Sequence, residues 1–315
     1  MKSLMTGGLL SFALIAPLMA AETIDQTQPI GADQSLRVAI PRGTVTFTAT
    51  DGDSVSIKGT LDEDTESFEF ETQGDAVVIK LRLPSEWHEH NGGSKGGAKL
   101  TIQYPASRDL EYSTVSADTD ATGLGQVRME SISGDFTLTG LTGRAWVESV
   151  SGDIEAKDLQ GDANLESVSG DIEERGGQGE MRLHTVSGDL DVENRATRLD
   201  LESISGDIEA RLGNIGQLRS RTVSGEMALK LAQLNPQGEV AAESVSGDIV
   251  LSIGGELNAR VLADTGPGGE IRNGWSSEEP RRGKYVSNES LEVTLGQGSG
   301  TIRLNTVSGD LRLKK

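Results

Sequence analysis

A short motif recurs along this chain at a constant spacing, and this repetition limits the fold more than any other feature. The motif is Ser/Thr-Val/Ile-Ser-Gly-Asp, and in the middle of the chain successive copies are 18 residues apart. Its glycines there are Gly134, Gly152, Gly170, Gly188 and Gly206. A constant short period indicates that each unit packs against copies of itself, because one such unit cannot bury its apolar side alone.

Each repeat unit carries two short segments in which apolar and polar residues alternate. In the first segment, one column is apolar in every copy and contains Val147, Leu165, Leu183 and Leu201. After Gly-Asp, a second apolar column contains Ile154, Ile172, Leu190 and Ile208. Two residues further on, Glu174 interrupts a column that is otherwise apolar. Alternation with a period of two predicts half-buried strands.

The Gly-Asp pair between the two strands predicts a tight corner. Glycine reaches backbone conformations that residues with a Cβ avoid, and aspartate bonds its local backbone and holds a turn. The same corner is expected in the longer units, at Gly225, Gly247 and Gly309. We therefore predict an all-β fold, a parallel β-solenoid whose 18–22-residue coils stack about 4.8 Å apart. The alternative is a meander or β-sandwich with fortuitous repetition.

The repeats divide the chain into three expected parts. Residues 1–20 resemble a secretory signal peptide, with Lys2 before an apolar stretch and Ala20 at the cleavage site. Residues 22–110 lack the period and are expected to form a β-rich N-terminal cap, since bare solenoid ends expose unpaired backbone. Residues 111–315 form the expected solenoid domain, and the segment from Leu291 to Lys315 is predicted to close the stack.

The charge of the chain excludes some classes of partner. With 49 acidic and 29 basic residues the net charge is −20, whereas nucleic-acid binding requires a basic surface. The chain has no cysteine for disulfides or thiolate metal sites. Beyond the signal peptide, no apolar run is long enough to span a membrane. The mature protein is therefore expected to be exported, to the periplasm, the cell surface or the medium.

The aspartate of the motif forms a candidate cation site. Stacking would place successive carboxylates about one rung apart, where unit charges repel by about 0.9 kcal/mol in water. Calcium prefers several carboxylate or carbonyl oxygens, so a row of Ca²⁺ ions would relieve this repulsion. Alternatively, each aspartate caps its own turn and points into water. This aspartate ladder contains Asp135, Asp153, Asp171, Asp189, Asp207 and Asp248, with Glu226 in the same column.

Histidines provide a second metal candidate. His88 and His90 flank Glu89 in a glycine-rich loop, and alternate residues of a strand share a face that could hold a transition metal. The alternative is that this loop is merely solvated. His184 stands in the column of Glu148, Glu166 and Glu202 and is interpreted as an exposed substitution.

The order of the motifs also resembles a known bacterial family. The Ser-Val-Ser-Gly-Asp-Ile corners, the Pro-Arg-Arg-Gly283 excursion and the closing segment up to Leu311 are similar to the toast-rack or "putative adhesin" family, a domain of unknown function. The resemblance covers roughly Leu36 to Lys315. It implies an exported, envelope-associated β-protein and brings no catalytic residues with it.

From these features we expect a non-enzymatic, adhesin-like scaffold or interaction protein of the bacterial cell envelope. Its partner would be an envelope protein or a glycan, bound on a flat face that carries Glu148, Glu166 and Glu202. Two alternatives stay open: an adhesin that depends on divalent cations held by the aspartates, and a glycan-active β-helix enzyme. Such an enzyme needs clustered acids in a cleft built by long loops, and the central coils have almost no loops.

Overall fold

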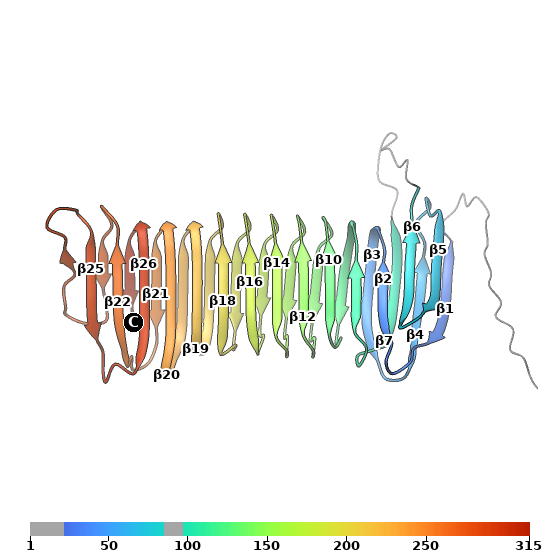
Figure 1. Ribbon diagram of the computed structural model, residues 1–315, viewed down its shortest axis with the longest axis horizontal. Helices are drawn as coiled ribbons and strands as arrows, with labels where there is room; N and C mark the ends of the chain where they lie inside the picture. Colours follow the sequence, from blue (N-terminus) through green and yellow to red (C-terminus); the bar gives the residue numbers. More distant parts are fainter. Residues whose placement is uncertain (1–21, 85–96) are drawn as a thin grey trace, which may run out of the picture.

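The computed structural model describes residues 22–84 and 97–315 and shows a long, straight rod of β-strands (Figure 1). Within these residues every regular element is a strand. Neighbouring repeats pair in parallel, so that Val147 lies beside Leu165, and Leu165 beside Leu183. The all-β fold and the parallel solenoid expected from the repeat are therefore confirmed.

Each central coil contributes one strand to each side of the rod. The first strands are β8 (Leu110–Ser113), β10 (Val127–Ser131), β12 (Ala145–Ser149), β14 (Ala163–Ser167), β16 (Glu180–Thr185) and β18 (Arg198–Ser203). The second strands are β9 (Ser116–Thr122), β11 (Phe136–Thr139), β13 (Ile154–Lys157), β15 (Ile172–Arg175) and β17 (Leu190–Asn194). The longer strands β19 (Ile208–Ser224) and β20 (Met227–Ser246) each continue from one side to the other, and β21 (Ile249–Ile253) follows them.

The core lies between the two sides and repeats from coil to coil. Val147, Leu165 and Leu201 are fully buried, as is Ile154 in the second column at 1% exposure. Burying such a side chain stabilises the fold by about 1.5–3 kcal/mol. Because like residues stack on like, a single 18-residue pattern supplies the interior of every central coil.

The motif glycines are required for a reason other than the one expected. None of the five central glycines has a positive φ. Instead, a Cβ built on Gly170 would lie 2.1 Å from the carbonyl oxygen of Gly152, and Gly188 meets Gly170 in the same way. The Ser167 hydroxyl sits in this corner: it accepts the amide of Gly170 at 2.9 Å and donates to the carbonyl of Gly152 at 3.4 Å. Close contact between coils, rather than backbone conformation, excludes a side chain here.

At the C-terminal end the coils are not stacked in the order of the sequence. Strands β26 (Gly300–Ser308) and β27 (Leu311–Lys314) lie between β20–β21 and β22 (Ala259–Thr265) with β23 (Ile271–Asn273). The chain terminus accordingly lies inside the rod and not at its tip (Figure 1). The prediction that Leu291 to Lys315 closes the stack is therefore wrong for β26 and β27, which form an interior rung, and holds only for the first residues of that segment.

Antiparallel strands cover this end instead. Strand β25 (Glu289–Thr294) pairs with β22, and β24 (Arg281–Arg282) pairs with β25. The buried Glu289 carboxylate accepts the amide of Ile271 at 2.8 Å, so a side chain satisfies backbone of the last parallel rung. This hydrogen bond, followed by the Arg282 guanidinium, holds the pKa of Glu289 below its usual value despite burial. Trp275 adds a donor to the Lys314 carbonyl at 2.6 Å.

The N-terminal end is built in the same way, with interior parallel rungs and antiparallel strands. Strands β2 (Ser35–Ala39) and β3 (Arg42–Thr50) pair in parallel with β8 and β9 on one side, and with β6 (Ala76–Arg82) and β7 (Ala98–Pro105) on the other. The sheet thus runs without a break past residue 110. The antiparallel strands at this end are β1 (Thr23–Pro29), β4 (Ser54–Thr60) and β5 (Ser67–Gln73).

A buried ion pair ties the N-terminal end together. The Asp62 side chain is completely buried, and Arg42 bonds both Asp62 and Asp64, each at 2.7 Å. Burial works against the charge on Asp62, but the bonds from Arg42 and from the Asp64 amide hold its pKa below the usual value. The expected signal peptide lies outside the described residues, and no helix among those described is long and apolar enough to cross a membrane.

Candidate functional site

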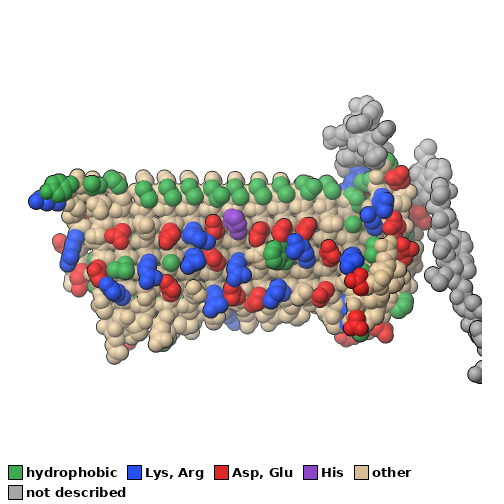
Figure 2. Space-filling model, viewed as in Figure 1, with side chains coloured by type: hydrophobic (Ala, Val, Ile, Leu, Met, Phe, Trp, Pro, Cys, Tyr) green, Lys and Arg blue, Asp and Glu red, His purple; other side chains and the backbone are tan. Residues whose placement is uncertain are grey.

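A row of exposed apolar side chains runs along one edge of the rod. The Val or Ile of each Ser-Val-Ser-Gly-Asp motif lies just outside the core, because the alternation that buries Val147 and Ser149 turns Val150 outward. Figure 2 shows these residues as an almost unbroken line. We call this row the apolar ridge; its members are 39–54% exposed and comprise Val115, Ile132, Val150, Val168, Ile204, Val223, Val245 and Val307, with the half-buried Val186 among them.

The apolar ridge is unusual for a protein surface. Isolated exposed aliphatic residues are common, whereas large contiguous apolar patches on soluble proteins mark interaction sites. These residues were not among the functional candidates predicted from the sequence. Their exposure can nevertheless be predicted from the sequence. Because side chains alternate between the two faces of a strand, Val147 is buried and Val150, three residues later, is exposed, and the same alternation applies in every coil.

A shallow groove of about 410 Å³ follows the ridge from β8 to β16. One wall consists of ridge residues, and the other of the outward column Glu130, Glu148, Glu166 and His184. Two of the three glutamates expected on a flat interaction face, Glu148 and Glu166, thus line this groove. The third, Glu202, does not, and its carboxylate accepts a hydrogen bond from Arg221 at 2.7 Å.

His184 is not the exposed substitution that was expected. Its side chain is half-buried, between Glu166 and Glu202 of the adjoining coils. The Nε2 atom is buried and has no hydrogen-bond partner among the residues that the structure describes. His184 therefore places a polar atom without a partner in the groove wall.

The carboxylates of the groove outnumber the basic side chains that contact them. Arg128 contacts Glu130 at 3.0 Å and Glu148 at 3.8 Å, and the Trp146 indole also donates to Glu148. Glu166 accepts a hydrogen bond from the neutral Asn164 amide at 2.6 Å. One guanidinium therefore pairs with two of the three carboxylates along this stretch, and the groove is a half-apolar, half-acidic surface.

The aspartate ladder lies on the other side of the ridge and is hydrogen-bonded from coil to coil as far as Glu226, and again from Asp248. The Oδ1 atom of Asp153 accepts the amide of Asp171 at 2.9 Å, and Asp171 accepts that of Asp189 at 2.8 Å. The aspartates therefore bond the next coil, whereas the alternative to cation binding had each one cap its own turn. The other links join Asp118 to Asp135, Asp135 to Asp153, Asp189 to Asp207, Asp207 to Glu226, Asp248 to Asp310 and Asp310 to Glu270.

Within residues 22–84 and 97–315, no three His, Cys, Asp or Glu side chains converge in an arrangement that could hold a metal ion. His88 and His90 lie outside the described residues. The backbone amides that the ladder carboxylates accept relieve part of the repulsion for which calcium was invoked.

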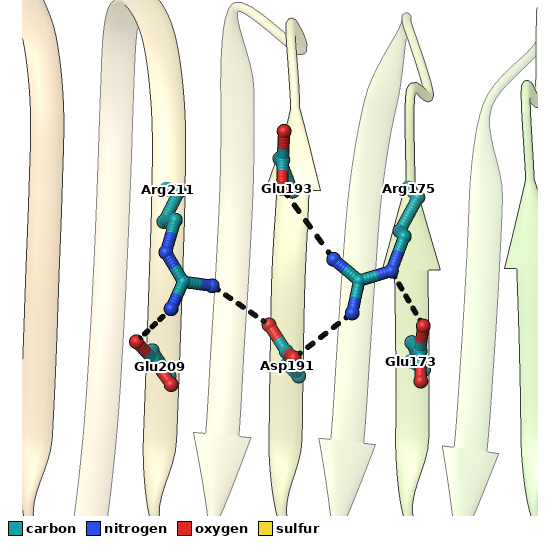
Figure 3. Close-up of polar contacts among 6 residues, drawn as sticks. All are labelled: Glu173, Arg175, Asp191, Glu193, Glu209 and Arg211. Atoms are coloured by element: carbon teal, nitrogen blue, oxygen red, sulfur yellow. Dashed lines mark hydrogen bonds and ion pairs between the residues drawn. The ribbon is translucent and has the colours of Figure 1, made fainter.

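On the opposite side of the rod, two arginines form a network of ion pairs with four acids. Arg175 contacts Asp191 at 3.1 Å and Glu193 at 3.4 Å, and Arg211 also reaches Asp191, at 3.5 Å (Figure 3). Glu173 and Glu209 complete this network. The network links three successive second strands, β15, β17 and β19, although its four acids outnumber its two arginines.

One acid lies inside the solenoid. Glu174 is fully buried in the column that is apolar in neighbouring coils, and it accepts hydrogen bonds from Asn194 Nδ2 at 2.8 Å and from the Gly177 amide at 2.7 Å. Loss of water raises its pKa from 4.5 to about 7, although both hydrogen bonds favour the charged form. The arrangement is enclosed, so Glu174 belongs to the core and not to the groove.

Comparison with known proteins places the chain by family. Solved structures to which the chain is similar include a "putative lipid binding protein" from Parabacteroides distasonis, with 12% identity, TM-score 0.46 and coverage of 93% of this chain and 97% of that one. A "putative adhesin" from Bacteroides fragilis has 12% identity, TM-score 0.37 and coverage of 94% and 99%. No curated protein matches. The family described as Toastrack DUF4097 matches residues 34–217 and 195–314. The chain therefore belongs to the Toastrack DUF4097 family.

Proposed function

We propose that this protein is an exported, non-enzymatic interaction protein of the bacterial cell envelope, adhesin-like in the sense that it binds through its side. The observation that carries this proposal is the apolar ridge, which exposes one β-branched residue per coil over most of the rod. A solvent-facing row of this length lowers solubility, so its regular presence favours a partner that covers it.

The rod is suited to such a role. Each coil contributes one apolar contact at a spacing set by backbone hydrogen bonds, so the binding surface is rigid before the partner arrives. A preorganised surface loses little conformational entropy on association. The groove beside the ridge is open and shallow, and its acids lie in a row along the wall rather than opposite one another, which supports binding rather than bond cleavage.

Replacing ridge residues tests this proposal. In the triple variant Val150→Thr, Val168→Thr, Val223→Thr the side chains keep their shape and strand preference, so folding is expected to be unchanged. Binding to envelope fractions, measured by pull-down at low salt, should fall about tenfold or more. The matched control Ala228→Thr, an exposed residue on the opposite side, should bind like the wild type. Equal binding by the triple variant would refute the proposal.

We further propose that the aspartate ladder is structural. Its carboxylates are occupied by amides of the next coil, as between Asp171 and Asp189. Thermal unfolding in calcium and in chelator should therefore give equal midpoints. A midpoint raised by calcium would instead favour the cation-dependent adhesin.

A further inference from the structure

We propose that the groove between β8 and β16 binds a basic, amphipathic α-helix of a partner protein. This inference rests on the proposed function and names the chemistry of the partner. It starts from the two walls of the groove, of which one is apolar through Ile132, Val150 and Val168, and the other acidic through Glu148 and Glu166.

Charge selects a basic partner. Along the groove the Glu column lies on one side of the ridge, and the aspartates Asp135, Asp153 and Asp171 lie on the other. A ligand that covers the ridge therefore meets carboxylates on both flanks. Lys or Arg side chains beside an apolar stripe would cover the ridge with their stems and place their charges next to these acids.

Charge also disfavours a second copy of this chain. Two copies that met ridge to ridge would bring together two Glu columns and two aspartate ladders, in molecules of net charge −20 each. Like charges placed opposite one another in an interface cost several kcal/mol.

The backbone hydrogen bonds of the rungs limit the secondary structure that the partner can have. Along the groove the amides and carbonyls of the rungs are paired with neighbouring coils, and the ridge presents side chains only. An extended peptide laid across the rungs would leave its own backbone groups without partners. A helix satisfies them internally and presents its side chains to a groove.

The dimensions of the groove agree with a helix. Neighbouring rungs lie about 4.8 Å apart, and successive helical turns about 5.4 Å apart. The four steps from β8 to β16 span about 19 Å, which corresponds to a helix of about 13 residues. Over this distance the two periods drift by about 2.4 Å, which flexible Leu and Lys side chains can absorb; over the whole ridge the mismatch would approach a full turn.

The test uses a synthetic 14-residue peptide of Leu and Lys with its leucines at helical spacing. Its controls are a scrambled peptide of the same composition and a Leu-Glu peptide of the same pattern. Binding to the whole protein is measured by calorimetry, and helix formation by circular dichroism. We expect a dissociation constant in the micromolar range for the Leu-Lys helix, and at least about tenfold weaker binding for both control peptides.

Substitutions locate the site. Val150→Thr with Val168→Thr should weaken binding about tenfold, and Glu148→Gln with Glu166→Gln should weaken it about threefold and reduce its dependence on salt. Ala228→Thr should leave it unchanged. Equal binding of the scrambled or acidic peptide, or no effect of these pairs, would overturn the inference.

Two results separate this inference from the function on which it rests. If the ridge variant loses envelope binding while the Leu-Lys peptide fails to bind the wild type, the interaction function stands and the helical partner is refuted. If sedimentation shows a dimer that Val150→Thr with Val168→Thr abolishes, the occupant is a second copy and the inference is again refuted.

Discussion

The middle of the rod and its two ends are built on different principles. In the middle, each coil pairs with the coil before and after it in sequence, in one register, as Ile154, Ile172 and Leu190 show. At both ends the order in space differs from the order in sequence. At the N-terminal end β2 and β3 are interior rungs, and β6 and β7, which come later in the chain, lie outside them. At the C-terminal end β26 and β27 are interior rungs, and β22 and β23, which come earlier in the chain, lie outside them. Antiparallel strands then complete each end.

The difference shows what repetition can and cannot do. An identical coil always leaves another free edge, and a free edge recruits further strands. The ends therefore depend on individual contacts that no repeat supplies, such as the Arg42–Asp62 ion pair and the bond from Glu289 to the Ile271 amide. The repeated coils set the length of the rod, whereas the non-repeated strands at its ends close it.

Removing residues 300–315 should have the largest effect. This truncation deletes β26 and β27, the interior rungs that link β22 and β23 to the rest of the rod. The amides of residues 259–294 should then lose their protection in hydrogen exchange, while those of β12 to β18 keep it, because each repeat contacts only its neighbours. Deleting β1, an outermost strand, is the control and should affect β4 alone. Retained protection at 259–294 would argue against the interleaved end.

Gly170→Ala should be the most damaging single substitution among those considered in the central coils. The new Cβ would lie 2.1 Å from the Gly152 carbonyl oxygen, in backbone that cannot move without separating two coils. We expect a loss of about 3 kcal/mol or more in denaturant unfolding. Gly140→Ala is the matched control: its Cβ has open space but φ is +63°, so only the conformational cost of about 1 kcal/mol applies. Equal losses would show that conformation, not contact, selects glycine.

Glu174 should give the rod a dependence on pH that most of the central coils lack. Its pKa is about 7 in the folded state against 4.5 ordinarily. Below 4.5 both states hold the proton; between 4.5 and 7 only the folded state does, so the free energy of unfolding falls as pH rises, and above 7 the loss is complete. A shift of this size corresponds to about 3 kcal/mol.

Glu174→Gln isolates this contribution. Relative to the wild type, the stability of the variant should increase by about 3 kcal/mol between pH 4 and pH 8. The comparison removes the many surface carboxylates that titrate in both proteins. A stability difference between the two that stays constant over this range would contradict the raised pKa.

Arg211→Gln should have the smallest effect. The side chain is 45% exposed and contacts Asp191 and Glu209 on the surface. Exposed ion pairs contribute about 1 kcal/mol or less, so we expect a loss of roughly 0.5 kcal/mol that disappears in 1 M salt. A loss above about 2 kcal/mol would mean that the network in Figure 3 holds the coils together.

The sequence by itself determined the central coils. A side chain such as Leu165 has Val147 and Leu183 as neighbours because all three occupy one column of an 18-residue period, and stacking like on like buries them all. The apolar ridge was equally determined, since the same alternation that buries Val147 exposes Val150. The charged columns, and not this ridge, were predicted to be functional.

Only the tertiary structure decided the order of the rungs at the ends, the bonding of the ladder and the surroundings of Glu174. The period does not say which coil is outermost, and β26 pairs equally well with β20 and β22 because all carry the same alternation. Likewise, the aspartates bond the next coil because the corner brings two backbones into contact, as between Gly152 and Gly170. Local pattern sets which side of a strand is buried, while the contacts between coils depend on three-dimensional packing that the pattern leaves open.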